Sequence, residues 1–142
     1  MPQKVLINED TPSKFILIGE DDADDQEMLK EVFTSIDHSF VLFFVNNGRE
    51  ILSALGKLRD DQMPCLIVLD YNMPGLNGAD ILKELGTNER YKNIPRVVWS
   101  TSASEKFRKL CLDLGAADYV IKPNNVIELE KIARYMLSIC LV

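Results

Sequence analysis

Residues that can take part in phosphoryl chemistry follow four apolar stretches of this chain. They are Glu20, Asp21 and Asp22 after residues 15–18, Asp70 after 66–69, Ser100 and Thr101 after 97–99, and Lys122 after 116–121. Magnesium prefers hard oxygen ligands such as carboxylates, and a carboxylate can attack phosphorus to form an acyl phosphate. A hydroxyl and an ammonium group can hold the remaining phosphoryl oxygens. Each residue alone fits an ordinary helix cap or strand end equally well, so the hypothesis depends on the whole set.

The elements predicted around these residues bring them to one edge of a sheet. Residues 66–69 form a continuous apolar run, which indicates a strand buried on both faces. Further strands are predicted at 15–18, 40–45, 95–99 and 116–121, and helical patterns follow each strand. Five strands alternating with five helices predict a parallel sheet with helices on both faces, and its strands share one carboxyl edge. The pattern alone leaves the strand order open.

Helix ends are predicted from capping residues. Asp22 is expected to cap the first helix, and the pairs Asn47 with Glu50 and Ser102 with Glu105 indicate two further starts. Glycines are expected to end two helices, at Gly86 and Gly115.

Composition and charge exclude several classes of protein. The chain of 142 residues has room for one domain, and we expect a loose leader at 1–13 and the domain at 14–142. A net charge of −6 disfavours nonspecific nucleic-acid binding. The longest apolar run is far shorter than a membrane span, and the first residues do not resemble a signal peptide. We therefore expect a cytoplasmic protein without a membrane segment.

The cysteines predict neither a zinc site nor a disulfide framework. Cys65, Cys111 and Cys140 stand far apart, their number is odd, and His38 is the one histidine. Each cysteine falls within an apolar stretch, so we expect three small buried side chains.

Taken together, these motifs resemble the receiver domain of two-component response regulators. The resemblance covers about Lys14 to Leu137 and depends on four features: the acidic pair after the first strand, the segment LDYNMPGLNG, a Ser or Thr after the fourth strand, and Lys-Pro after the fifth. It implies a flavodoxin-like (βα)5 three-layer sandwich with a parallel five-stranded sheet in the order 2-1-3-4-5. A weaker resemblance links the chain to stand-alone regulators that partner phytochrome-type histidine kinases.

The resemblance also implies a role for each residue of the site. The implied roles are Asp70 as phospho-acceptor, Asp21 as direct metal ligand, Glu20 acting through water, Asn72 as a ligand through its backbone carbonyl, Ser100 as switch hydroxyl, Lys122 as phosphate-binding lysine and Tyr119 as switch aromatic. The metal would be Mg²⁺ or Mn²⁺, and the peptide bond between Lys122 and Pro123 is expected to be cis. Glu20 stands where Asp is commoner in the family, Trp99 and Arg96 stand where aliphatic residues are expected, and no sequence argument accounts for Arg96.

These observations favour a single-domain response regulator, which is a phospho-acceptor rather than an enzyme acting on other molecules. Its expected partners are a sensor histidine kinase or phosphotransfer protein and a downstream protein of unknown identity. The apolar end of the chain, MLSICLV, suggests a homodimer surface, although core burial explains it nearly as well. Three alternatives stay open: a receiver-like adaptor that is never phosphorylated, an aspartate-nucleophile phosphohydrolase, and a flavin-binding module, which is disfavoured because acids after the first strand would repel phosphate. The phosphohydrolase is disfavoured because Asn72 stands where a second acid would be needed.

Overall fold

The computed structural model describes residues 15–140, so the predicted leader at 1–13 and the last two residues lie outside the described part of the chain. The strands are β1 (Phe15–Gly19), β2 (Val41–Val45), β3 (Leu66–Asp70), β4 (Arg96–Ser100) and β5 (Asp118–Ile121). The helices are α1 (Ala23–Ile36), α2 (Gly48–Gly56), α3 (Gly78–Thr87), α4 (Glu105–Asp113) and α5 (Val126–Cys140), with a short 3-10 turn at Asp60–Gln62.

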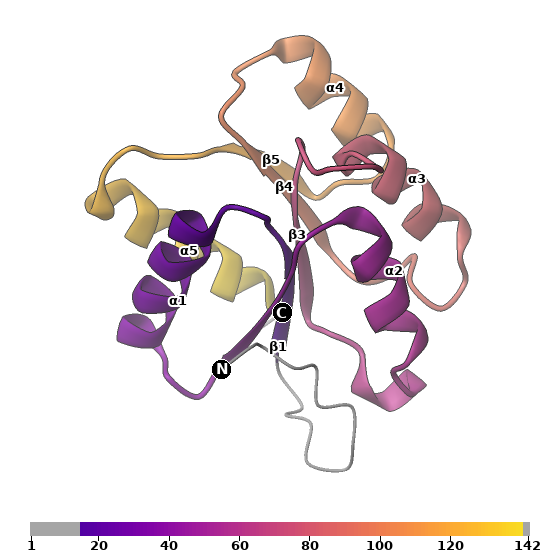
Figure 1. Ribbon diagram of the computed structural model, residues 1–142, viewed down its shortest axis with the longest axis horizontal. Helices are drawn as coiled ribbons and strands as arrows, with labels where there is room; N and C mark the ends of the chain where they lie inside the picture. Colours follow the sequence, from indigo (N-terminus) through magenta and orange to yellow (C-terminus); the bar gives the residue numbers. More distant parts are fainter. Residues whose placement is uncertain (1–14, 141–142) are drawn as a thin grey trace.

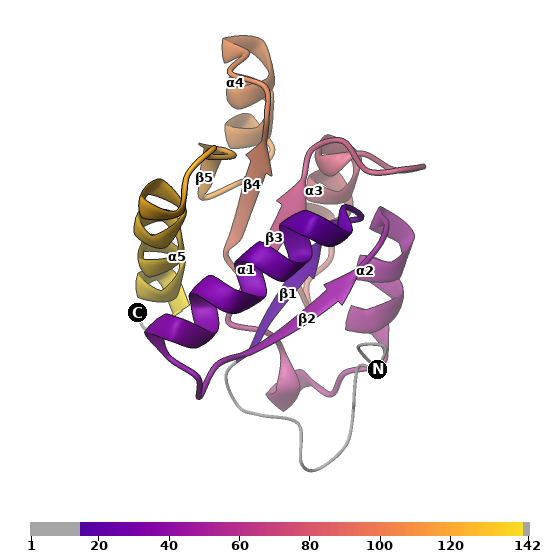
Figure 2. The ribbon, with the colours of Figure 1, turned by 60° about the vertical axis from the view of Figure 1, so that its left-hand side comes forward.

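All five strands are parallel and lie in the order β2-β1-β3-β4-β5. Helices α1 and α5 cover one face of the sheet, and α2, α3 and α4 cover the other (Figures 1 and 2). This three-layer, flavodoxin-like arrangement confirms the predicted fold class and the strand order that the resemblance implied. The β3–β4 register pairs Asp70 with Trp99, and the β4–β5 register pairs Ser100 with Ile121. The polar residues that follow the strands therefore share one edge, as expected.

Two apolar cores hold the layers together because side chains alternate across the sheet. Ile16 and Val68 pack on the side of α1 and α5, against Leu29 and Leu129. The neighbouring Leu17 and Ile67 of the same strands belong to the core beneath α2, α3 and α4. The interior strands β1, β3 and β4 are buried along their whole length, which explains their unbroken apolar runs.

The predicted helix starts are confirmed at two positions and wrong at a third. The side chain of Asp22 accepts from the backbone N–H of Asp25 at 2.9 Å, and Asn47 caps α2 in the same way. Ser104, rather than Ser102, caps α4, accepting from the Phe107 N–H. Ser102 Oγ instead accepts from the Ser104 N–H, so the chain makes a further turn before the helix begins.

Of the two predicted helix ends, one is confirmed and the other is wrong. Gly115 follows α4 with a positive φ of 103°, a conformation that favours glycine, so its expected role is confirmed. Helix α3 does not end at Gly86 but continues to Thr87, with Asn88 as its C-cap. A glycine within the last turn is tolerated in a helix, so the residue type alone does not locate the end.

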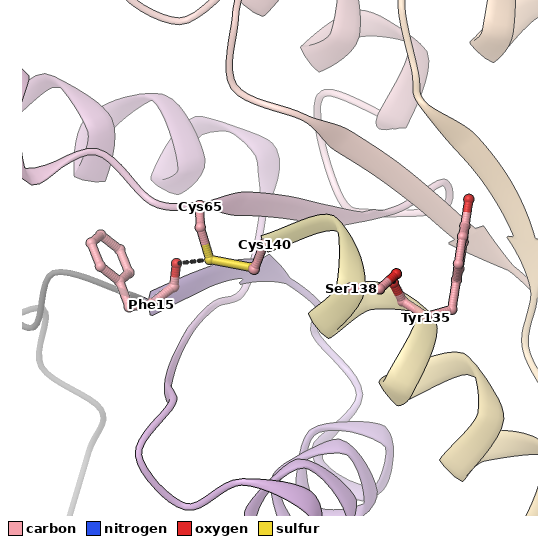
Figure 3. The surroundings of a disulfide bond; sticks show 5 residues. All are labelled: Phe15, Cys65, Tyr135, Ser138 and Cys140. Carbon is pink, nitrogen blue, oxygen red and sulfur yellow. Dashed lines mark hydrogen bonds between the residues drawn. A yellow bond between two sulfur atoms is a disulfide. The ribbon is translucent and has the colours of Figure 1, made fainter. Parts of the chain in front are cut away.

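The expectation of three unbonded cysteines is wrong for two of them. Cys65 and Cys140 form a disulfide, with their Cα atoms 4.9 Å apart, and Cys65 Sγ lies 3.4 Å from the carbonyl oxygen of Phe15 (Figure 3). Cys111 is free and buried, as expected. The two bonded residues are 75 positions apart, and they meet because β3 begins where α5 ends. Met136, Leu137 and Cys140 are buried, so core packing accounts for this part of the apolar C-terminal stretch.

Arg96, for which the sequence offered no account, is buried at the amino end of β4. Its Nη1 donates to the carbonyl oxygens of Lys92 and Ile94, at 2.7 and 2.9 Å. Burial lowers the pKa of its guanidinium group. Gly115 lies directly against it, because a Cβ at that position would be 2.7 Å from Arg96 Nη2. Arg96 thus ties the start of β4 to the loop before it, and Gly115 leaves the space for its side chain.

Candidate functional site

Three carboxylates gather at the carboxyl edge of the sheet. Glu20 and Asp21 follow β1, Asp70 ends β3, and one oxygen from each lies within 4.8 Å of the others. Glu20 and Asp70 are buried, whereas Asp21 is exposed. Hard oxygen donors at this spacing suit Mg²⁺ or Mn²⁺, so the donor set fits the predicted metal. The structure thus brings together the three carboxylates predicted as metal ligands.

Lys122 extends from the end of β5 into this cluster. Its Nζ donates to Glu20 Oε1 and to Asp70 Oδ2, each at 2.9 Å, and to Asp25 Oδ2 at 3.0 Å. Burial lowers the pKa of Lys122, but the three carboxylates outweigh that effect and hold the pKa above its usual value. Lys122 therefore stays charged beside the proposed acceptor.

Asp25 is a member of the cluster that the sequence analysis missed. An acid at this position suits the positive end of the α1 dipole, but the Asp25 side chain also forms an ion pair with Lys122, which lies 97 residues further along the chain. The run of acids at the start of α1 was the available signal, but it did not indicate which acid would reach Lys122.

Glu20 is enclosed more completely than its neighbours. Oε1 accepts from Lys122 Nζ and also from Trp99 Nε1 at 3.1 Å, while Oε2 accepts from the backbone N–H of Asp22 at 2.9 Å. Burial raises the pKa of Glu20 to about 7; the hydrogen bonds from Lys122 and Asp22 oppose this shift, and the charge of Asp70 adds to it. Trp99 is thus a second residue whose contact with the site the sequence did not predict.

Asp70 is held in place by its own loop. Its Oδ1 accepts from the backbone N–H of Asn72 at 3.0 Å, while Oδ2 faces Lys122. The ligand role of the Asn72 carbonyl stays a prediction. The peptide bond between Lys122 and Pro123 is trans, since the described residues contain no cis peptide bond, so the expected cis bond is wrong for this structure. The two isomers before proline differ by only about 0.5–1 kcal/mol, which a local sequence does not decide.

The two predicted switch residues meet at Ser102. Ser100 is fully buried, and its Oγ accepts from the Ser102 N–H at 3.1 Å. Tyr119 is also buried, and its hydroxyl donates to the Ser102 carbonyl oxygen at 2.8 Å. The loop after β4 therefore connects the hydroxyl beside the site to the aromatic side chain of β5.

Several large apolar side chains of α4, β5 and α5 are exposed. They include Leu110, Ile121, Val126 and Ile127.

No helix in the described range 15–140 has the length and apolar character needed to cross a membrane.

Comparison with known proteins agrees with this geometry. A family model described as the response regulator receiver domain matches residues 16–134. The chain is 31% identical over 134 residues to the response regulator Rcp1 of Synechocystis sp., covering 91% of this chain and 90% of that protein. It is 28% identical over 125 residues to the chemotaxis protein CheV2 of Helicobacter pylori, covering 88% of this chain but 39% of that longer protein.

Two solved structures have the same fold with similar coverage. The phosphorylated cyanobacterial phytochrome response regulator RcpA superposes with a TM-score of 0.81 at 28% identity, covering 90% of this chain and 94% of that one. The Mn²⁺-bound form of Rcp1 superposes with a TM-score of 0.77 at 29% identity, covering 88% and 92%.

Proposed function

Because the chain belongs to the response regulator receiver domain family, we propose that it accepts a phosphoryl group on Asp70 in a Mg²⁺-dependent step. One observation carries the proposal: the buried Asp70 carboxylate lies beside two further acids and 2.9 Å from the Lys122 ammonium. An acceptor oxygen, oxygen ligands for a metal and a fixed cation thus occur at one point. The protein would modify itself and would not turn over a separate substrate.

Each side chain has a distinct task in this proposal. Asp21, Asp70 and the Asn72 carbonyl would hold the metal, and Glu20 would hold it through water. Bound Mg²⁺ would neutralise charge on the phosphoryl oxygens. A carboxylate oxygen of Asp70 attacks phosphorus and the bond to the donor breaks, while Lys122 moves toward the transferred group. Ser100 would then donate its hydroxyl to a phosphoryl oxygen.

Phosphorylation would change the face made by α4, β5 and α5. Ser100 and Tyr119 both contact Ser102, so movement of Ser100 toward the phosphoryl group would also disturb the partner of Tyr119. Such a change favours an arrangement that already exists as a minor state. The exposed apolar residues Ile121 and Leu110 lie on this face, which would bind a downstream protein or a second copy of the chain.

We propose a sensor histidine kinase or a phosphotransfer protein as the donor, within the cytoplasm. Similarity to RcpA, a cyanobacterial phytochrome response regulator, favours a phytochrome-type kinase. Similarity to Rcp1 over nearly its whole length favours a stand-alone role.

The test is intact mass after incubation with acetyl phosphate, with and without Mg²⁺. We expect one added phosphoryl group that requires Mg²⁺ and is absent from Asp70→Asn. Asp113→Asn is the matched control, because Asp113 is an exposed acid paired with Lys109 at the end of α4, and it should be modified like the wild type.

The alternatives give different results in this experiment. A receiver-like adaptor would show no added mass with acetyl phosphate or with a phosphorylated kinase, and this would overturn the proposal. A phosphohydrolase would release many equivalents of inorganic phosphate per chain. The proposed acceptor would release phosphate only as slowly as its own phosphorylated form decays.

A further inference from the structure

Trp99 contacts two of the charged residues of the site. It lies in β4 next to Asp70 in the register and is 1% exposed. Its Nε1 donates to Glu20 Oε1 at 3.1 Å, and Lys122 Nζ lies 4.9 Å from the centre of its ring. A buried aliphatic residue would fill this space without either contact, so the indole contributes more than packing.

The partners of Glu20 differ in how freely they can move. The Asp22 N–H is a backbone group at the start of α1, and the indole of Trp99 is enclosed in the core beneath α1 and α5. Lys122 has a flexible side chain and divides its hydrogen bonds among three carboxylates. When Lys122 moves to a phosphoryl group on Asp70, the hydrogen bonds from Trp99 and Asp22 still hold the carboxylate of Glu20.

We propose that Trp99 is a positioning residue of the metal site: its enclosed indole N–H, rather than the mobile Lys122 ammonium, keeps the Glu20 carboxylate in one orientation. This inference deepens the proposed function and rests on it. Partners of this kind, which orient a metal-binding side chain, commonly change metal affinity by about tenfold or more when they are removed. The ring face also supports the Lys122 ammonium, a contact that does not depend on the N–H group.

The single tryptophan of the chain makes the N–H group separately testable. Expression in a tryptophan auxotroph with β-(3-benzothienyl)alanine replaces residue 99 alone, and a sulfur atom replaces the N–H in a ring of similar shape. Binding of Mg²⁺ is measured by isothermal titration calorimetry, and binding of Mn²⁺ by electron paramagnetic resonance. We expect the dissociation constants for both ions to increase about tenfold.

Comparing the replacement in the wild-type protein and in Glu20→Gln distinguishes a loss of positioning of Glu20 from general damage to the structure. In Glu20→Gln the same replacement should change the dissociation constants less than twofold, because the charged acceptor is already gone. Trp99→Phe, which also lacks the N–H, should reproduce the pattern in both backgrounds. Unchanged affinity in the wild-type background, or equal weakening in both backgrounds, would overturn the role of Trp99.

The result also distinguishes this inference from the proposed function. If the wild-type protein binds Mg²⁺ and is phosphorylated on Asp70 but the replacement has no effect, only the role of Trp99 fails. If the wild-type protein binds neither ion, the proposed metal site fails and the role of Trp99 fails with it.

Discussion

The two ends of β3 lie in opposite chemical environments. At the amino end, Cys65 is covalently bonded to Cys140 of α5, and the neighbouring strand begins with Arg96 held by two carbonyl oxygens. At the carboxyl end, Asp70 lies in a cluster of acids that share one lysine. The amino end is held by a covalent bond and neutral acceptors, whereas the carboxyl end is held by charges.

The two ends of β3 therefore differ in what they would contribute: the amino end stabilises the fold, and the carboxyl end would respond to added charge. Bonds at the amino end would not change on the proposed binding of a metal ion or a phosphoryl group, so they would keep the sheet and α5 in register. The balance at the carboxyl end would be altered by each added charge, as the proposed switch requires. Stability that depends on the amino end should therefore be insensitive to Mg²⁺, while stability that depends on the carboxyl end should follow it.

The largest expected effect is at the disulfide. Reduction should lower the free energy of unfolding by about 4 kcal/mol, because the bond closes a long loop in the unfolded chain. Urea unfolding with and without dithiothreitol measures the change, and Mg²⁺ affinity should be unchanged at low denaturant. A Cys65→Ala, Cys140→Ala double variant should be insensitive to the reductant. Equal urea midpoints for the oxidised and reduced wild-type protein would contradict a stabilising role for the disulfide.

Lys122→Ala should have the next largest effect. Without metal it leaves buried Glu20 and Asp70 without their shared cation, which should cost about 3 kcal/mol of unfolding free energy. Added Mg²⁺ should restore part of this loss, and thermal melts at several Mg²⁺ concentrations measure it. Lys131→Ala, which removes an exposed pair with Glu128, should change stability by less than about 0.5 kcal/mol. If Mg²⁺ does not reduce the loss of stability in Lys122→Ala, bound metal does not stabilise this edge of the sheet.

Gly115→Ala tests the packing at the amino edge. A positive φ and a Cβ too close to Arg96 should together cost about 2 kcal/mol, with or without Mg²⁺. Gly56→Ala is the matched control, since nothing lies within 4 Å of its Cβ position at the end of α2, and it should gain about 0.5 kcal/mol. Chemical denaturation of both variants gives the two values; a neutral Gly115→Ala would refute the close packing.

Asp70→Asn should have the smallest effect and the opposite sign. It removes one charge from a cluster in which acids outnumber the lysine, so the metal-free protein should gain about 1 kcal/mol of stability. The gain should shrink in high salt, which screens the repulsion. Thermal melts in a chelator at low and high ionic strength measure it. A lower melting temperature for Asp70→Asn would show that its bond to Lys122 outweighs the repulsion.

Local patterns were enough to predict most of the fold. Each strand is a short apolar run, and each helix has an apolar face. The cap residues Asp22 and Asn47 accept hydrogen bonds from backbone N–H groups only three residues further along the chain. Because parallel strands share one carboxyl edge, residue order alone brought Asp70 and Lys122 together. The errors at Ser102 and Gly86 arose because a second residue of a type that can cap a helix, Ser104 or Asn88, stands two positions further along the chain.

The amino-acid sequence by itself determined the alternation of strands and helices, and with it the edge at which the acids and the lysine meet. Only the tertiary structure decided which distant side chains touch: Cys65 with Cys140, Asp25 with Lys122, and Trp99 with Glu20 across 79 residues. The physical reason is that periodicity and capping act over a few residues and leave a pattern in the chain. A contact between separate elements depends on strand order and on how each side chain is oriented, and neither leaves a local signature.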